Sequence, residues 1–189
     1  YVVCLHEQAC SIAAEAYARV TNKPGLLMVT TGPGGTNALT GVTAAYIEST
    51  PMIVLSGQVK RADMVNGQGI RQQGMQEVDI ISMVKPVTKY AALVTEPQDI
   101  KYHLDRALYG AVHGRKGPVW LDIPLDVQAS MIEETTLRGW KPAEISEQEK
   151  NEKRKQLEQQ VMETIAQLNQ ARRPVLLAGN CLLYTSPSP

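Results

Sequence analysis

The sequence predicts a three-layer α/β/α fold with a mostly parallel sheet, followed by the start of a second α/β domain. Short apolar runs alternate with helical patterns along the chain, and glycine-rich or polar turns separate them. The runs have no polar face, which is typical of strands that are buried on both sides. Repeated β-α units of this kind form a parallel sheet with helices on both faces.

The expected elements follow one another in a regular order. The strands are predicted at residues 1–5, 26–30, 52–55, 88–94 and 118–124. The helices are predicted between them, at residues 9–20, 39–46, 78–84 and 100–111. A polar loop over residues 60–74 is long enough to indicate a functional or mobile segment.

The chain changes character after this α/β pattern. Residues 1–128 are predicted to form the first domain, which lacks its own first strand and helix, and residues 129–148 a linker. Residues 149–183 then start a second, central domain, with a charged helix and a fresh strand at 174–180. The final residues, 184–189, abandon the pattern and are interpreted as a non-native tail.

Composition excludes several classes of partner. The 19 basic and 19 acidic side chains balance, so neither nucleic acid nor an anionic membrane is expected to bind. No stretch approaches the roughly 18 apolar residues that a membrane span needs. The three cysteines show no spacing typical of metal ligands, which predicts buried thiols, a reducing compartment and a cytoplasmic location.

One carboxylate stands out at a junction between a predicted strand and helix. Glu7 follows the apolar run 1–5 and precedes the first helix. This places it at the carboxyl end of the sheet, where open α/β folds bind ligands. An acidic residue in a first helical turn also complements the helix dipole, so Glu7 alone leaves both interpretations open.

Four segments and one strand support the ligand interpretation when they are taken together and in order. The chain resembles the N-terminal, pyrimidine-binding domain of thiamine diphosphate-dependent enzymes, nearest the acetolactate synthase and pyruvate oxidase branch. The segments are His6-Glu7-Gln8-Ala9 with Ala14-Glu15-Ala16-Tyr17-Ala18-Arg19, Gly32-Pro33-Gly34-Gly35-Thr36-Asn37, Pro51-Met52 to Ser56-Gly57-Gln58-Val59, and Met75-Gln76-Glu77-Val78-Asp79, and the strand is Gly117-Pro118-Val119-Trp120-Leu121-Asp122-Ile123-Pro124.

The resemblance assigns the cofactor side of the site. In the family, the carboxyl at the position of Glu7 hydrogen-bonds a ring nitrogen of the aminopyrimidine and favours its imino tautomer. We expect burial among apolar neighbours to raise the pKa of Glu7 for this role. The resemblance also implies that Gly34 lets backbone approach the ligand and that Thr36 and Asn37 line the pyrimidine side. Alternatively, Thr36 or Asn37 only caps a helix.

The substrate side shows two departures from the family. Gln76 matches the glutamine of the Phe-Gln-Glu motif, whose neutral amide can donate to a developing oxyanion, although an exposed loop amide is the alternative. Met75 stands where acetolactate synthases usually carry phenylalanine, and Leu125 stands where they carry lysine. We therefore count Met75, Gln76 and Leu125 as substrate-side residues, and an acceptor such as a sugar aldehyde stays an alternative to acetolactate formation.

The resemblance further implies the cofactors and partners of the complete enzyme. Thiamine diphosphate and Mg²⁺ are expected, but the Gly-Asp-Gly segment that binds Mg²⁺ in the family does not occur in these 189 residues, so no metal site is assigned here. A FAD requirement is left open. The expected partners are a 2-oxo acid and a second copy of the chain, in a homodimer or higher oligomer. A noncatalytic relative and an unrelated nucleotide-binding α/β domain are the competing hypotheses.

Overall fold

A computed structural model describes residues 1–65, 67–143, 147–177 and 179 of the chain. The chain forms two compact units, Tyr1–Lys141 and Pro142–Pro189. The predicted domain boundaries near residues 128 and 148 stay predictions. The predicted tail at 184–189 lies outside the described residues.

A parallel sheet of four strands organises the first unit, and its spatial order is β1-β2-β4-β3. Every strand pairing in the described chain is parallel, in agreement with the predicted sheet. The register places Ser56 of β2 opposite Asp122 of β4. The strands are β1 (Gly25–Val29), β2 (Met52–Gln58), β3 (Tyr90–Leu93) and β4 (Pro118–Pro124).

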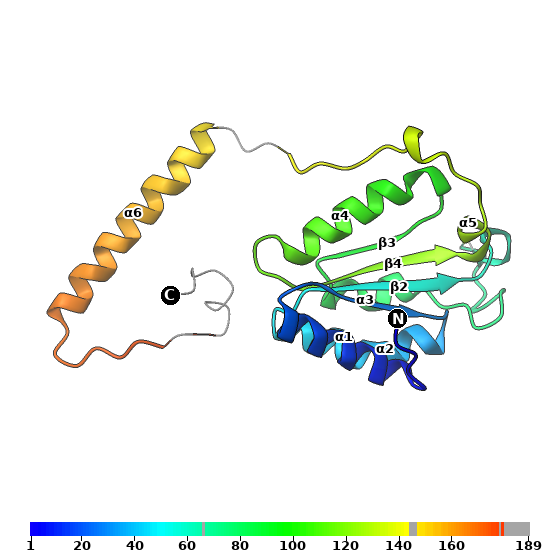
Figure 1. Cartoon of the computed structure of the whole chain (residues 1–189), viewed down its shortest axis with the longest axis horizontal. Coiled ribbons are helices and arrows are strands. Elements are labelled where there is room, and N and C mark those ends of the chain that lie inside the picture. Colours follow the sequence, from blue (N-terminus) through cyan, green and yellow to red (C-terminus); the bar gives the residue numbers. More distant parts are fainter. Residues whose placement is uncertain (66, 144–146, 178, 180–189) are drawn as a thin grey trace. The chain divides into compact units, whose positions relative to one another are not determined.

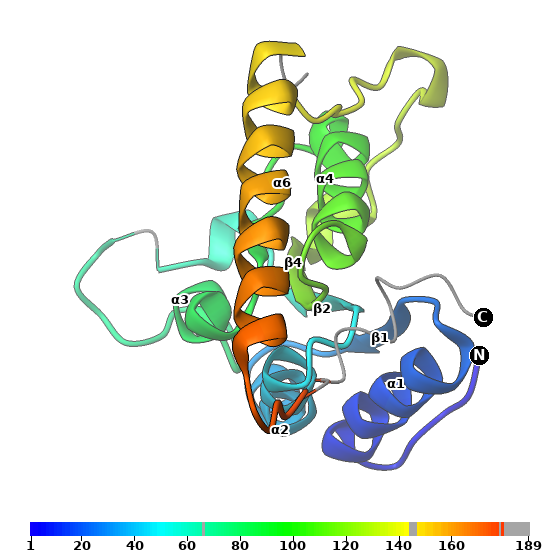
Figure 2. The same ribbon diagram turned by 90° about the vertical axis from the view of Figure 1, so that its left-hand side faces the viewer.

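Helices cover both faces of the sheet, which confirms the predicted three layers (Figure 1 and Figure 2). The helices α1 (Glu7–Thr21), α2 (Pro33–Ile47) and α3 (Ile80–Val84) lie on one face, and α4 (Ile100–Val112) lies on the other. The larger core cluster brings α1, α2 and α3 together around the buried Trp120 of β4. The smaller cluster packs Ala107 and Ala111 of α4 against the opposite face of β4.

Short elements connect these layers. Single turns of 3₁₀ helix are η1 (Arg61–Asp63), η2 (Lys85–Val87), η3 (Pro97–Asp99) and η4 (Glu134–Thr136), and a one-turn helix α5 (Leu125–Gln128) follows β4 directly. The strands β1, β2 and β4 therefore end in loops or in α5 at the same edge of the sheet. This edge is where parallel α/β sheets bind ligands.

Two predicted strands are wrong. Residues 1–4 have no regular structure, and Tyr1, Val2 and Leu5 are largely exposed. A strand is held by hydrogen bonds to a neighbouring strand, and no strand of the described sheet pairs with this segment. Residues 174–177 likewise form no strand and have no partner strand among the described residues. Residues 178 and 180 of that prediction lie outside the described residues.

The second unit consists, in its described part, of the predicted charged helix and a short following segment. This helix, α6, spans Glu147–Gln170. Its large apolar residues are between 37 and 66% exposed, and they are Leu157, Val161, Met162, Ile165 and Leu168. Among the helices of the described chain, none is long and apolar enough to cross a membrane.

Candidate functional site

Glu7 is the first residue of α1 and meets α2 through its side chain. Its Oε2 accepts a hydrogen bond of 2.9 Å from Nδ2 of Asn37. The same Nδ2 lies 3.1 Å from Nε2 of His6, so the two amide hydrogens of Asn37 can serve both neighbours. The structure thus brings together two residues that the resemblance assigns to the cofactor side, although they are 30 residues apart in the sequence.

The environment of Glu7 differs from the expected one. The residue is only half-buried. The hydrogen bond from Asn37 and a backbone N–H lower the pKa of the Glu7 carboxyl, and the neighbouring His6 adds to this effect. The expectation of a pKa raised by apolar burial is therefore wrong for this chain. The position in a first helical turn also fits the helix-dipole interpretation.

The glycine-rich turn supplies the close backbone approach at this point. A Cβ built on Gly34 would lie 2.6 Å from Cγ2 of Thr30 and 3.4 Å from Oε1 of Glu7. Glycine at this position therefore lets the Thr30 side chain pack against the backbone beside the carboxylate, where a Cβ would overlap the Thr30 methyl group. The hydroxyl of Thr36 instead donates to the carbonyl of Pro33 in the same helical turn.

The helix-cap alternative for Thr36 and Asn37 is wrong. The N-cap of α2 is Gly32, which makes no side-chain cap bond, and Thr36 and Asn37 lie inside the first turns of the helix. The side chain of Asn37 is directed to Glu7 and His6 rather than to a free backbone N–H. Its role in the cluster does not depend on capping.

Gln76 lies against the start of the same turn. It is an exposed residue with a positive φ of 60°, which is uncommon for a residue other than glycine. Its carbonyl oxygen occupies the space that a Cβ on Gly32 would need, and Gly32 itself has a φ of 61°. The loop that carries Gln76 and the turn that leads to Gly34 are therefore packed backbone against backbone.

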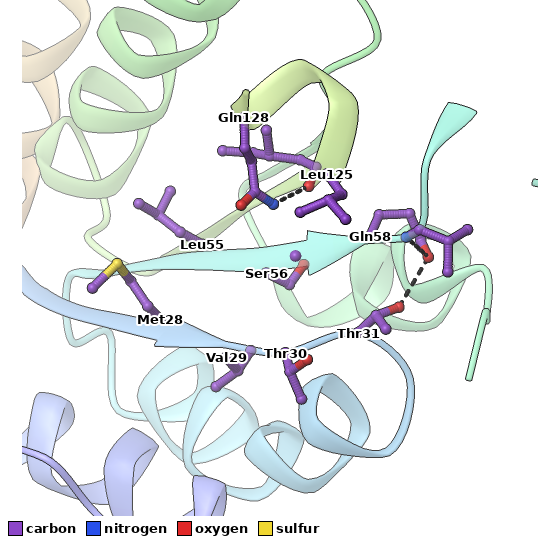
Figure 3. Close-up of a pocket in the computed structure, with 12 residues that line it drawn as sticks. Met28, Val29, Thr30, Thr31, Leu55, Ser56, Gln58, Leu125 and Gln128 are labelled. Carbon is purple, nitrogen blue, oxygen red and sulfur yellow. Dashed lines mark hydrogen bonds between the residues drawn. The ribbon is translucent and has the colours of Figure 1, made fainter. Parts of the chain in front are cut away.

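Leu125 belongs to a separate cavity of about 520 Å³ at the ends of β1, β2 and β4. Figure 3 shows Thr30 and Thr31 after β1, Ser56 and Gln58 on β2, and Leu125 and Gln128 around it. Glu7 and Asn37 are not among its lining residues. Met75 does not line it either, and its side chain is 83% exposed. The three predicted substrate-side residues are thus not gathered in one cavity.

A buried polar network at the same edge of the sheet escaped sequence reasoning. Asp122 of β4 is 1% exposed, and its Oδ1 accepts a hydrogen bond of 2.5 Å from the hydroxyl of Ser56. Its Oδ2 accepts a bond of 2.8 Å from Nε2 of Gln58. The hydroxyl of Ser56 in turn accepts from Nε1 of Trp120 at 2.7 Å. The carboxyl ends of β2 and β4 are joined by these side chains.

Burial dominates the electrostatics of this network. Removal from water raises the pKa of the Asp122 carboxyl to about 6, and the nearby charge of Asp79 acts in the same direction. The hydrogen bonds from Ser56 and Gln58 oppose the shift. One sequence signal could have found this residue: an acidic side chain in the middle of an otherwise apolar strand needs partners on the neighbouring strand.

Comparison with known proteins gives a consistent result. Residues 1–83 match the family model for the thiamine pyrophosphate enzyme, N-terminal TPP binding domain, where TPP is another name for thiamine diphosphate. The acetolactate synthase large subunit of Lactococcus lactis subsp. lactis (strain IL1403) is 34% identical over 185 residues, which cover 98% of this chain and 30% of that protein.

Two further relatives agree. The acetolactate synthase large subunit of Haemophilus influenzae is 44% identical over 126 residues, 67% of this chain and 21% of the relative. The mitochondrial acetolactate synthase of Schizosaccharomyces pombe is 40% identical over 134 residues, 71% of this chain and 19% of the relative. The chain thus spans less than a third of the length of these relatives. It belongs to the thiamine pyrophosphate enzyme family and carries the N-terminal TPP-binding domain of its acetolactate synthase-like members.

Proposed function

We propose that this chain is the pyrimidine-binding part of a thiamine diphosphate-dependent lyase or transferase that decarboxylates a 2-oxo acid and joins the product to an acceptor. One observation carries the proposal: the Glu7 carboxylate, oriented by Asn37, stands beside the bare backbone of Gly34. The relatives are acetolactate synthases by name, which supports an acetolactate synthase-like reaction. The alternative acceptor is a sugar aldehyde, because Met75 and Leu125 depart from the pattern that the family usually shows.

The residues present fit the aminopyrimidine half of the cofactor. Gly34 carries no side chain beside Oε1 of Glu7, so this position would not block a flat ring that approaches the carboxylate. Oε2 is held by Asn37, which fixes the plane of the carboxylate. A carboxylate that is oriented but still half-exposed suits a ligand that has yet to cover it.

Bound thiamine diphosphate supplies a carbanion-like nucleophile and an electron sink. Glu7 would hold and share a proton at Oε1 for the aminopyrimidine, and Asn37 orients the carboxylate by donating to Oε2. Burial of Glu7 beneath a bound ring would raise its pKa toward the neutral range, where proton transfer is efficient. Gln76 donates its amide N–H to the oxygen that gains negative charge in the substrate.

The rest of the enzyme is proposed from the family resemblance. Mg²⁺ and the diphosphate are held outside residues 1–189, because Gly-Asp-Gly is absent from this sequence. A second copy of the full-length protein contributes that domain, so the working unit is a homodimer or a larger homo-oligomer. FAD binding is left to experiment. A cytoplasmic, reducing location is supported by the free thiols of Cys4 and Cys10.

Two measurements on the full-length protein test the proposal. Thiamine diphosphate is titrated into the protein in the presence of Mg²⁺ to measure binding, and the consumption of pyruvate is then assayed. We expect saturable binding and turnover that depends on the cofactor. The same assay on the isolated 189 residues is expected to show no turnover, because the diphosphate site is missing. If the full-length protein neither binds the cofactor nor consumes a 2-oxo acid, the noncatalytic alternative replaces the proposal.

A further inference from the structure

Gln58 occupies the centre of the buried network and uses all of its hydrogen-bonding capacity. Its Nε2 donates to Oδ2 of Asp122 at 2.8 Å and to the carbonyl of Val78 at 3.0 Å. Its Oε1 accepts from the hydroxyl of Thr31 at 2.9 Å and from the backbone N–H of Val59 at 3.0 Å. A flipped amide would set its oxygen against two acceptors, so the network determines the orientation of Gln58.

The bond to Val78 connects the sheet to the loop that carries Gln76. Val78 lies two residues after Gln76, and the side chain of Glu77 between them accepts from the backbone N–H groups of Val65, Gln73 and Gly74. Glu77 therefore organises the loop internally, at distances of 2.7 to 3.1 Å. Gln58 is the side chain that anchors this loop to the end of β2 through a described hydrogen bond.

Two glycines allow the loop to lie this close to the sheet edge. A Cβ on Gly74 would lie 2.8 Å from the side chain of Val59, and one on Gly32 would overlap the carbonyl oxygen of Gln76. The loop is thus packed between the ends of β1 and β2. A lateral displacement of its Val78 end would move Gln76 relative to the turn at Gly32.

Asp122 sets the position of Gln58 in this arrangement. It is nearly inaccessible to solvent, and it sits on the central strand β4, whose register with β2 is fixed by seven residue pairs. A buried amide donor without an acceptor is costly, so Gln58 is retained where Asp122 can accept. We call the hydrogen-bonded series Asp122–Gln58–Val78 the relay. Its Asp122 end is held rigidly in the sheet, whereas its Val78 end belongs to the loop, which can move.

We propose that Asp122, acting through Gln58, is a positioning residue that fixes the loop at residues 74–79 and so places the side chain of Gln76 for the reaction. This inference rests on the proposed function of Gln76. Asp122 and Gln58 act through the loop in this proposal. Their effect is transmitted through the bond between Gln58 and the carbonyl of Val78.

The test combines hydrogen exchange with kinetics in the full-length protein. Gln58→Met keeps the length of the side chain and removes all four hydrogen bonds. We expect amide exchange in residues 74–79 to accelerate about tenfold, as loss of one hydrogen bond implies. The value of kcat should fall about tenfold with little change in KM, because the lost interaction acts in the transition state.

Variants at position 122 separate positioning from folding. Asp122→Leu removes both carboxylate oxygens that accept hydrogen bonds, so it should reproduce the effects of Gln58→Met. Asp122→Asn keeps one oxygen that can accept from Gln58, so amide exchange in the loop should stay as slow as in the wild type. Thr31→Val removes a bond to Oε1 of Gln58 but keeps the bonds from Gln58 to Val78 and Asp122, and should leave loop exchange within about twofold. If Asp122→Leu does not fold, Gln58→Met decides the question.

Three outcomes would overturn the inference. Unchanged exchange of residues 74–79 in Gln58→Met would show that the relay does not hold the loop. Equal acceleration in β4 and α1 would indicate a general loss of stability. Faster amide exchange in the loop without a fall in kcat would show that the position of the loop does not affect the reaction. Because exchange needs no turnover, its result stands apart from failure of the proposed reaction, and Gln76→Ala should lower kcat without altering loop exchange.

Discussion

Two carboxylates at the same edge of the sheet have opposite environments. Glu7 is half-buried at the start of α1 and accepts from Asn37, and these contacts lower its pKa. Asp122 is fully buried on β4, and desolvation raises its pKa to about 6 although two side chains donate to it. Similar hydrogen bonds thus accompany opposite shifts because burial differs.

This difference in burial distinguishes Glu7, whose carboxylate is accessible to a ligand, from Asp122, whose carboxylate stabilises the fold. A half-buried, oriented carboxylate keeps its charge and can still be covered by a ring. A buried carboxylate with every partner supplied by the fold has little capacity to act on a ligand. Gly32 lies between these two regions, since it precedes α2 on one side and contacts the loop of Gln76 on the other.

The largest expected effect is that of Glu7→Gln in the full-length protein. We expect kcat/KM for the 2-oxo acid to fall by about two to four orders of magnitude, the usual range for a lost acid-base group. Glu48→Gln is the matched control, because Glu48 is a surface residue paired with Arg19 at 3.4 Å. Steady-state assays of both variants provide the measurement. Equal rates for wild type and Glu7→Gln would leave Glu7 with only its dipole role.

Gly32→Ala should disrupt the junction between the two regions. We expect a loss of about 3 kcal/mol in unfolding free energy, because the positive φ and the overlap with the Gln76 carbonyl both penalise a Cβ. Gly114→Ala isolates the first cause. Gly114 has a φ of 62° and open space around it, so the cost should be about 1 kcal/mol. Urea denaturation compares the two, and equal losses would contradict the contact with Gln76.

The buried carboxylate predicts a specific dependence of stability on pH. Between pH 4 and 6, roughly, folded Asp122 holds a proton that the unfolded chain releases. Stability therefore falls as pH rises through this window, by up to about 3 kcal/mol. Burial lowers the pKa of His103, which has the opposite effect on the slope. The unfolding free energy of wild type minus that of Asp122→Asn, measured across this pH range, cancels the contribution of His103. If this difference does not change with pH, Asp122 is not a buried ionisable group.

Asn37→Ala is expected to have the smallest effect of the four. Loss of the amide donor should raise the pKa of Glu7, because the bond from Asn37 is the largest cause of its lowering. We expect kcat/KM to fall about tenfold, as loss of a hydrogen bond to a charged group implies. The acidic limb of the pH profile should move to higher pH. Thr36→Ala is a control for the same helical turn, and an acidic limb unchanged in Asn37→Ala would mean that Asn37 does not orient Glu7.

Local patterns were sufficient to predict most of the fold. The strand at 118–124 agrees with β4, and the helices near Ala9, Leu39 and Ile100 lie within α1, α2 and α4. Continuous apolar runs and amphipathic periodicity are properties of neighbouring residues, so they are visible in the chain itself. The run at 1–5 has the same local character, but a strand also needs a partner, and partners are set by tertiary pairing.

The sequence by itself determined the alternation of strands and helices, the parallel sheet, and the candidate residues Glu7, Gly34 and Asn37. Only the tertiary structure decided the burial of each charged group, and therefore the direction of its pKa shift. Glu7 proved more exposed than expected, and Asp122 was joined to Ser56 and Gln58 across a strand pairing that separates them by more than 60 residues. The physical reason is that desolvation depends on everything packed around a side chain, whereas propensity depends on its neighbours along the chain.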